Sequence, residues 1–140
     1  MYVVVLGDLN ARVGDVEIEG VVGKYGVPGR NESGESLIQM CLVNEMSVGN
    51  TFFKKKDINK YTWVRVNDGQ LVDRAMMDYV LMKKKMIGRV LDVHVFRGEG
   101  TGMSDHFMVK TSVRVAERWR KQEGANRVRK VLNVRGLDDV

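Results

Sequence analysis

Several polar residues in the sequence carry side chains suited to acid-base chemistry or to binding a metal ion. Each lies next to a run of apolar residues: Asp8 with Asn10, then Asp78, and finally Ser104, Asp105 and His106. Side chains at the ends of strands are held by a rigid sheet, which can direct them into one cleft. The sequence therefore suggests that these residues meet at one rim.

The first polar group, Gly7-Asp8-Leu9-Asn10, ends the apolar run Val3–Leu6. If the backbone stays extended, alternate residues point the same way, so Asp8 and Asn10 would place a carboxylate and an amide on one wall. Asp and Asn also open turns after strands, which is their most frequent role there. Both interpretations, a polar wall and a simple turn, stay open.

Ser104-Asp105-His106 contains every residue type of a serine hydrolase triad. Adjacent residues in an extended chain face opposite ways, so Asp105 cannot orient His106 while Ser104 meets the same imidazole. A serine hydrolase is therefore disfavoured. The same geometry favours Asp105 as a ligand for a hard cation and His106 as a phosphate contact, with Asp78 orienting the imidazole. The alternative is that His106 is merely an exposed or capping residue beside a turn.

Composition limits the class of protein. The 140 residues are 44% hydrophobic and 29% charged with one proline, which is typical of a folded chain with room for one modest domain. The apolar runs fall far short of the roughly 18–20 residues that span a bilayer, so no membrane partner is expected. Lone Cys41 and two histidines disfavour a disulfide framework and a structural zinc site. The net charge of +5 permits an anionic partner.

The elements that must position the polar groups are predicted mainly as strands. Val3–Leu6 is a largely β-branched run, typical of a strand buried on both faces. Residues 11–34 are rich in Gly, Asn and Asp and are predicted as a long loop. The apolar spacing from Glu35 onward predicts one amphipathic helix that ends near Glu45, with Ser33 as its N-cap.

Five further extended segments are predicted: Ser47–Phe53, Lys60–Val66, Met77–Met82, Val90–Phe96 and Phe107–Val115. Their connections are mostly too short for helical crossovers, which favours antiparallel pairing. The last segment alternates apolar and polar residues and is predicted to be half exposed. The sequence therefore predicts an α+β fold of mostly antiparallel strands, followed by a basic segment at 116–140.

Short strings in a fixed order connect the sequence to a known family. They are Gly7-Asp8-Leu9-Asn10-Ala11, Tyr61-Thr62-Trp63, Met77-Asp78-Tyr79-Val80-Leu81 and Ser104-Asp105-His106. Each string is weak alone, but their order resembles the C-terminal half of the endonuclease/exonuclease/phosphatase superfamily. Further strings are similar to the endonuclease domain of RTE-type non-LTR retrotransposons: Asn31-Glu32-Ser33-Gly34-Glu35, Gly49-Asn50-Thr51-Phe52-Phe53 and Asp57-Ile58-Asn59-Lys60-Tyr61-Thr62-Trp63.

The resemblance implies a fold and an activity. The fold would be the C-terminal half of a four-layer αββα sandwich of the deoxyribonuclease I type, with Trp63 and Tyr79 in its core. The activity would be Mg²⁺-dependent nicking of DNA, with Mn²⁺ as the alternative ion and the nucleus as the place of action. Hard oxygen ligands suit such ions, and a cation with hydrogen-bond donors offsets charge on the phosphate.

The resemblance also implies roles for individual residues. Asp8 would orient or deprotonate the attacking water, and Asn10 would hydrogen-bond a phosphate oxygen. Asp105 would help to hold the metal ion. Asp78 would orient His106, which would contact the scissile phosphate.

One departure from the family pattern bears on activity. In the family, the first half of the domain supplies the principal metal-binding glutamate, and no glutamate precedes Asp8 here. Residues 1–115 are therefore expected to be a partial domain without its N-terminal half, followed by a basic tail or linker at 116–140. Such a chain is expected to be inactive alone, or to need an upstream segment or another chain that supplies the missing half. The alternatives are a non-catalytic basic module that binds nucleic acid or protein, and a product that never folds stably.

Overall fold

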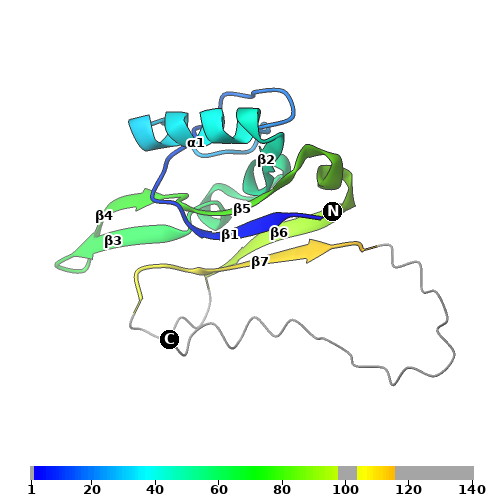
Figure 1. The fold of residues 1–140 in the computed structure, drawn as a ribbon. Helices are drawn as coiled ribbons and strands as arrows, with labels where there is room; N and C mark the ends of the chain where they lie inside the picture. Colours follow the sequence, from blue (N-terminus) through cyan, green and yellow to red (C-terminus); the bar gives the residue numbers. More distant parts are fainter. Residues whose placement is uncertain (1, 98–103, 116–140) are drawn as a thin grey trace, which may run out of the picture.

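A three-stranded antiparallel sheet lies at the centre of the structure (Figure 1). The computed structural model describes residues 2–97 and 104–115. The strand order in the sheet is β1 (Val4–Asp8), β5 (Asp78–Lys83), β2 (Met46–Val48). The register of β1 against β5 places Asp8 directly opposite Asp78. Two carboxylates that are far apart in sequence therefore meet at one end of the central sheet.

Two smaller antiparallel sheets complete the strands of the described residues. They are β3 (Trp63–Asn67) with β4 (Gln70–Ala75), and β6 (Val90–Phe96) with β7 (Met108–Val113). The β3–β4 hairpin projects from the body (Figure 1), and its turn residues Asp68 and Gly69 have φ angles of 50° and 74°. Left-handed conformations at both central residues match the twist of a two-residue hairpin, and an Asp-Gly pair adopts them readily.

The helix α1 (Glu32–Val43) covers one face of the central sheet (Figure 1). Its N-cap is Asn31, whose side-chain oxygen accepts hydrogen bonds from the backbone N–H groups of Gly34, at 2.8 Å, and Arg12, at 3.0 Å. The predicted cap, Ser33, lies inside the helix, so that prediction was wrong. The asparagine is better placed because it satisfies the helix and the preceding loop together. None of the helices among the described residues is long and apolar enough to cross a membrane.

Two hydrophobic cores lie on opposite sides of the central sheet. The core beneath α1 contains Ala11, Val13, Val21, Val22, Leu37, Ile38, Cys41, Met46, Val48, Met76, Tyr79 and Leu81. The core against the β6–β7 sheet contains Val80, Met82, Met86, Val90 and Val93. Successive side chains of a strand point to opposite faces, so β5 contributes alternately to the two cores. Each fully buried aliphatic side chain contributes about 1.5–3 kcal/mol through its burial.

The strand β1 differs from its prediction. The apolar run at its start was expected to be buried on both faces, but Val4, Val5 and Leu6 are 38%, 40% and 53% exposed. Among the described residues, β1 pairs only with β5 and no element covers its other edge. A β-branched run predicts a strand, whereas burial depends on the neighbours that pack around it.

The other segments follow the predictions to different degrees. The predicted antiparallel pairing is confirmed, and β6 has the predicted bounds. The segment predicted as a strand over Ser47–Phe53 divides into β2 and a 3-10 helix, Gly49–Phe52. The strand β4 was not predicted. Two further 3-10 helices are Asp57–Asn59 and Lys84–Arg89. Residues 98–103 and the basic tail predicted at 116–140 lie outside the described residues.

Candidate functional site

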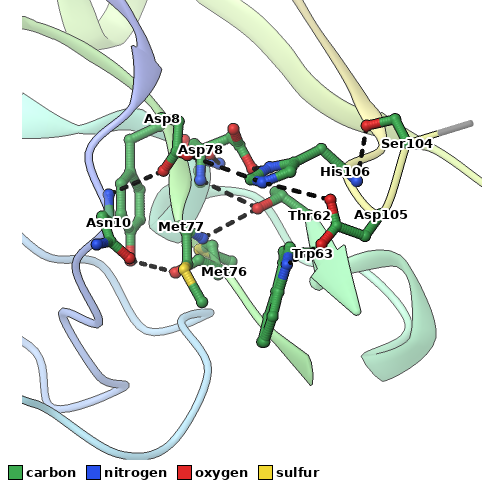
Figure 2. A network of polar contacts seen from close by, with 12 residues as sticks. Asp8, Asn10, Thr62, Trp63, Met76, Met77, Asp78, Ser104, Asp105 and His106 are labelled. Atoms are coloured by element: carbon green, nitrogen blue, oxygen red, sulfur yellow. Dashed lines mark hydrogen bonds and ion pairs between the residues drawn. The ribbon is translucent and has the colours of Figure 1, made fainter. Parts of the chain in front are cut away.

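Four polar side chains surround one point at the end of the central sheet (Figure 2). Asp8 ends β1, Asp78 begins β5, and Asp105 and His106 lie in the turn before β7. The His106 Nδ1 atom is 2.9 Å from Asp78 Oδ2. Its Nε2 atom is 3.8 Å from Asp8 Oδ2 and 3.9 Å from Asp105 Oδ1. The imidazole therefore lies among three carboxylates that come from separate parts of the chain.

The backbone around Asp78 is fixed by two buried polar side chains. The hydroxyl oxygen of Thr62 accepts hydrogen bonds from the N–H groups of Met77, at 2.9 Å, and Asp78, at 3.0 Å. The Asn50 amide donates to the carbonyl of Asp78 and accepts from the N–H of Val80, both at 2.9 Å. Asn50 thus takes the place of a strand neighbour where β2 ends. Sequence reasoning assigned no role to Thr62 or Asn50, although both lie in strings that carried the resemblance.

The turn that carries Asp105 and His106 is attached to the start of β3. The N–H of Val64 donates to the carbonyl of Asp105, at 3.0 Å, and the indole N–H of Trp63 donates to Asp105 Oδ2, at 2.9 Å. Trp63 is half-buried, so its predicted place in the core was wrong, because its polar edge holds Asp105 instead. Ser104 accepts the N–H of His106, at 3.1 Å, so its hydroxyl closes the turn.

Asp8 and Asn10 form a turn as well as a polar rim. Asn10 has a φ of 46°, and its N–H donates to Asp8 Oδ1 at 2.9 Å. The backbone is therefore not extended here, so the condition under which Asp8 and Asn10 would share a wall is not met. The second carboxylate oxygen of Asp8 faces His106, whereas Figure 2 shows Asn10 beside Asp8 rather than beside the imidazole.

The carboxylates alter the pKa of His106. Burial by itself lowers the pKa of the imidazole, because a partly desolvated cation is less stable. The hydrogen bond to Asp78 and its negative charge act in the opposite direction, and the charges of Asp8 and Asp105 add to them. The net result is a pKa above the usual value for histidine. The site therefore favours an imidazolium more than water does.

The donor set fits a hard cation. Asp8, Asp78 and His106 each offer one ligand atom, and these atoms lie within 4.8 Å of one another. Asp105, the residue predicted to hold the metal ion, is outside this group of three. However, Asp78 is already hydrogen-bonded to His106, whereas the carboxylates of Asp8 and Asp105 are 48% and 63% exposed. Exposed carboxylate oxygens are ligands that Mg²⁺ and Mn²⁺ prefer.

Comparisons with known proteins give a partial similarity. No protein-family description matches the chain, and no solved structure matches it. Craniofacial development protein 2 from Tragulus javanicus is 32% identical over 111 residues, which cover 79% of this chain and 19% of that protein. The protein of the same name from Bos taurus is also 32% identical over 111 residues, covering 79% of this chain and 18% of the relative. The chain spans about a fifth of the length of these curated relatives.

Proposed function

We propose that this chain, a distant relative of part of craniofacial development protein 2, carries part of a retroelement-type endonuclease that cleaves phosphodiester bonds in DNA with Mg²⁺ or Mn²⁺. The observation that carries the proposal is the meeting of Asp8, Asp78, Asp105 and His106 at one rim. A carboxylate-oriented imidazole beside exposed carboxylates suits a reaction in which negative charge builds on phosphate.

The residues of the rim have the following proposed roles. His106 donates Nε2–H to a phosphate oxygen. Asp78 accepts the hydrogen bond from Nδ1–H and so keeps the imidazole ring oriented. Asp8 orients the attacking water, and Asn10 donates its amide to a phosphate oxygen. Asp105, with Asp8, would hold Mg²⁺, which when bound supplies positive charge next to the phosphate. The raised pKa of His106 supports this assignment, because the imidazolium is the stronger donor.

The proposal includes the fold and the extent of the site. The layers observed here, α1 and β6–β7 on opposite faces of the central sheet, fit the C-terminal half of a four-layer αββα sandwich. Mg²⁺ takes six oxygen ligands, some of them water, and at this rim the described residues offer two exposed carboxylates, Asp8 and Asp105, that no Lys or Arg pairs with. A further segment, from a longer chain or from a partner, would complete the site. We propose the nucleus, where DNA is found, as the place of action.

Paramagnetic Mn²⁺ tests whether the site holds a metal ion. In ¹H–¹⁵N spectra of the 140-residue chain, substoichiometric Mn²⁺ should broaden the amides of Leu9, Asn10 and Phe107 before others. The double variant Asp8→Asn with Asp105→Asn should lose this selective broadening, whereas the matched control Asp57→Asn, exposed on a separate 3-10 helix, should keep it. Broadening that ignores Asp8 and Asp105 would remove the basis of the proposal.

Plasmid nicking tests the extent of the site. We expect no Mg²⁺-dependent nicking by the 140 residues alone, because two carboxylates hold the ion weakly. Nicking that Asp8→Ala abolishes would instead show that the chain is sufficient, and would overturn the requirement for a further segment. The rival function, a basic module that binds nucleic acid by charge, predicts DNA binding that weakens steeply with salt and does not change in Asp8→Ala.

A further inference from the structure

A pocket opens on the opposite face of β5 from the imidazole, between the loop that follows β1 and the base of the β3–β4 hairpin. Its volume is about 270 Å³. Its wall is mainly apolar, and glycines contribute backbone atoms to it. The lining also includes Arg12, Arg74 and the ring of Tyr61. The volume lies just below the range of about 300–1,000 Å³ that is typical of small-molecule pockets, which suits a ligand no larger than about one nucleotide unit.

The guanidinium of Arg74 is held without an acidic partner. It lies over the ring of Tyr61, 4.0 Å from the ring centroid, and it forms no ion pair with any residue that the structure describes. Stacking on an aromatic face orients the guanidinium plane and leaves its N–H edge free to donate. A planar edge of N–H donors matches the oxygens of phosphate.

Arg12 places a second guanidinium at the same pocket. One of its nitrogens donates to Asp73 Oδ2 at 2.7 Å, and its side chain is 36% exposed. One carboxylate therefore accompanies two guanidinium groups, so these groups together carry a net positive charge at the pocket. The walls formed by Gly14 and Gly29 lack side chains, and their φ angles of 81° and 99° suit glycine, which keeps this side of the pocket open.

The pocket is connected to the candidate site through the backbone. Tyr79, which lines the pocket, directly follows Asp78 along β5. Its hydroxyl lies 2.8 Å from the carbonyl oxygen of Ala11 and 2.6 Å from that of Met76, which fixes the pocket wall. Arg12 lies two residues after Asn10. A ligand in the pocket would therefore lie on the Asn10 side of the imidazole cluster.

We infer that this pocket binds the phosphate of a nucleotide unit between the guanidinium groups of Arg12 and Arg74, with the rest of the unit against Tyr61 and Met76. The phosphate belongs either to a nucleic-acid strand or to a free nucleotide. The strand source rests on the proposed function, because there the pocket would hold another stretch of the nucleic-acid strand that is cut. Phosphate binding itself requires neither the metal ion nor the carboxylates of the candidate site.

The test uses the 140-residue chain with EDTA and constant ionic strength. Adenosine monophosphate, inorganic phosphate and a short single-stranded DNA are titrated separately while ¹H–¹⁵N signals are followed. Saturable shifts are expected for the amides of Gly14 and Gly29 and for the Nε–H of Arg74. Arg74→Gln should weaken binding by about tenfold or more. The matched control Arg114→Gln removes the same charge from an exposed position just after β7 and should change nothing.

The outcomes separate the sources. Tighter binding of DNA than of the mononucleotide supports a strand, whereas binding of the mononucleotide alone supports a free nucleotide and contradicts the link to cleavage. Absence of saturable shifts, or equal weakening by Arg74→Gln and Arg114→Gln, would overturn the inference. Tyr61→Leu is the second variant, and it should weaken binding while leaving the unfolding midpoint within a few degrees. The Mn²⁺ experiment is independent, so the pocket and the proposed function can fail separately.

Discussion

The two edge strands of the central sheet have opposite environments. Every residue of β2 is buried, and Val48 is 0% exposed, whereas every residue of β1 is exposed. Yet β1 contains the more apolar run, and both strands pair with the same neighbour, β5. The contrast shows that sequence determines whether a segment forms a strand, while the surrounding elements determine whether it is buried.

The covering of β2 comes from the loop and the helix around it. The N–H of Val48 donates to the carbonyl of Val21 at 2.8 Å, and the hydroxyl of Ser47 donates to the carbonyl of Gly20 at 2.5 Å. No comparable contact reaches the far edge of β1 among the described residues. Asp8 therefore lies at the less supported edge, and the order of the site depends on the residues that hold Asp78.

The largest test of this comparison places a lysine at a matched position in each strand. Val48→Lys buries an unpaired charge and should cost more than about 4 kcal/mol, enough to unfold a small domain. Val5→Lys, at the position that faces Leu81 from the other side as Val48 does, should cost less than about 1 kcal/mol. It should also reduce self-association, because a charge on an exposed apolar edge blocks strand pairing. Urea unfolding and sedimentation measure both effects. Equal losses from the two variants would show that β1 is as well covered as β2.

A smaller effect is expected from the support behind Asp78. Thr62→Val leaves the N–H groups of Met77 and Asp78 without their acceptor at a buried position, which should cost about 2 kcal/mol. Thr111→Val is the matched control, since its hydroxyl makes a single hydrogen bond, to the carbonyl of Asp92, at a half-buried position, and it should cost about 1 kcal/mol or less. Chemical denaturation compares them. If Thr111→Val loses as much unfolding free energy as Thr62→Val, the two hydrogen bonds of Thr62 give the backbone at Asp78 no additional stability.

The pKa of His106 reports directly on the carboxylates that surround it. Asp78→Asn should lower the pKa, because the raised value depends on the hydrogen bond and charge of Asp78. Asp105→Asn should lower it less, because that carboxylate is 3.9 Å away. Imidazole NMR signals followed through a pH titration without metal ions measure both. An unchanged pKa in Asp78→Asn would contradict the pairing.

The sign of the linked stability follows from the raised pKa. A group with a higher pKa in the folded state adds stability that is fully present below its unfolded pKa. That contribution disappears as the pH rises through the folded pKa of His106. Asp78→Asn should therefore destabilise the protein more at weakly acidic pH than above the folded pKa, a difference that urea unfolding at the two pH values measures.

The smallest effect is expected at the ion pair that joins the loop after β1 to β4. The hydrogen bond from Arg12 is the main cause that lowers the pKa of Asp73, although partial burial opposes it. A lowered carboxyl pKa adds stability above its unfolded pKa, which is lost as the pH falls through the folded pKa. Arg12→Gln should cost about 0.5 kcal/mol at neutral pH, because the pair is exposed and screened, and nothing at acid pH. A loss that persists in acid would identify packing as the cause.

Sequence reasoning succeeded where the signal was local. The predicted extended segments Met77–Met82 and Val90–Phe96 coincide with β5 and β6, and the alternating segment Phe107–Val115 contains β7. The acids at strand ends marked Asp8 and Asp78 as neighbours of His106. The spacing of apolar residues also located the helix α1. These features depend on the chain's own periodicity and on the alternation of side chains, which a sequence shows directly.

Sequence reasoning failed where the answer depends on distant partners. Trp63 is apolar enough for a core, yet its indole N–H donates to Asp105, which lies in the turn before β7. Asn31 outcompetes Ser33 as the N-cap because it also binds Arg12, nineteen residues earlier in the chain. The strand β4 has only the short apolar pair Leu71 and Val72, without alternation, and forms because an Asp-Gly turn folds it back onto β3. Such contacts become visible only when the fold brings the partners together.

The alternation of β5 between the two cores has a consequence for the way the molecule opens. Tyr79 and Leu81 belong to the core beneath α1, while Val80 and Met82 belong to the core against β6 and β7. Amide hydrogens in the middle of β5 should therefore exchange with solvent only when both halves of the structure come apart together. This one strand joins the two layers into a single cooperative unit, and Asp78 lies at its first residue, where protection against exchange begins to fall.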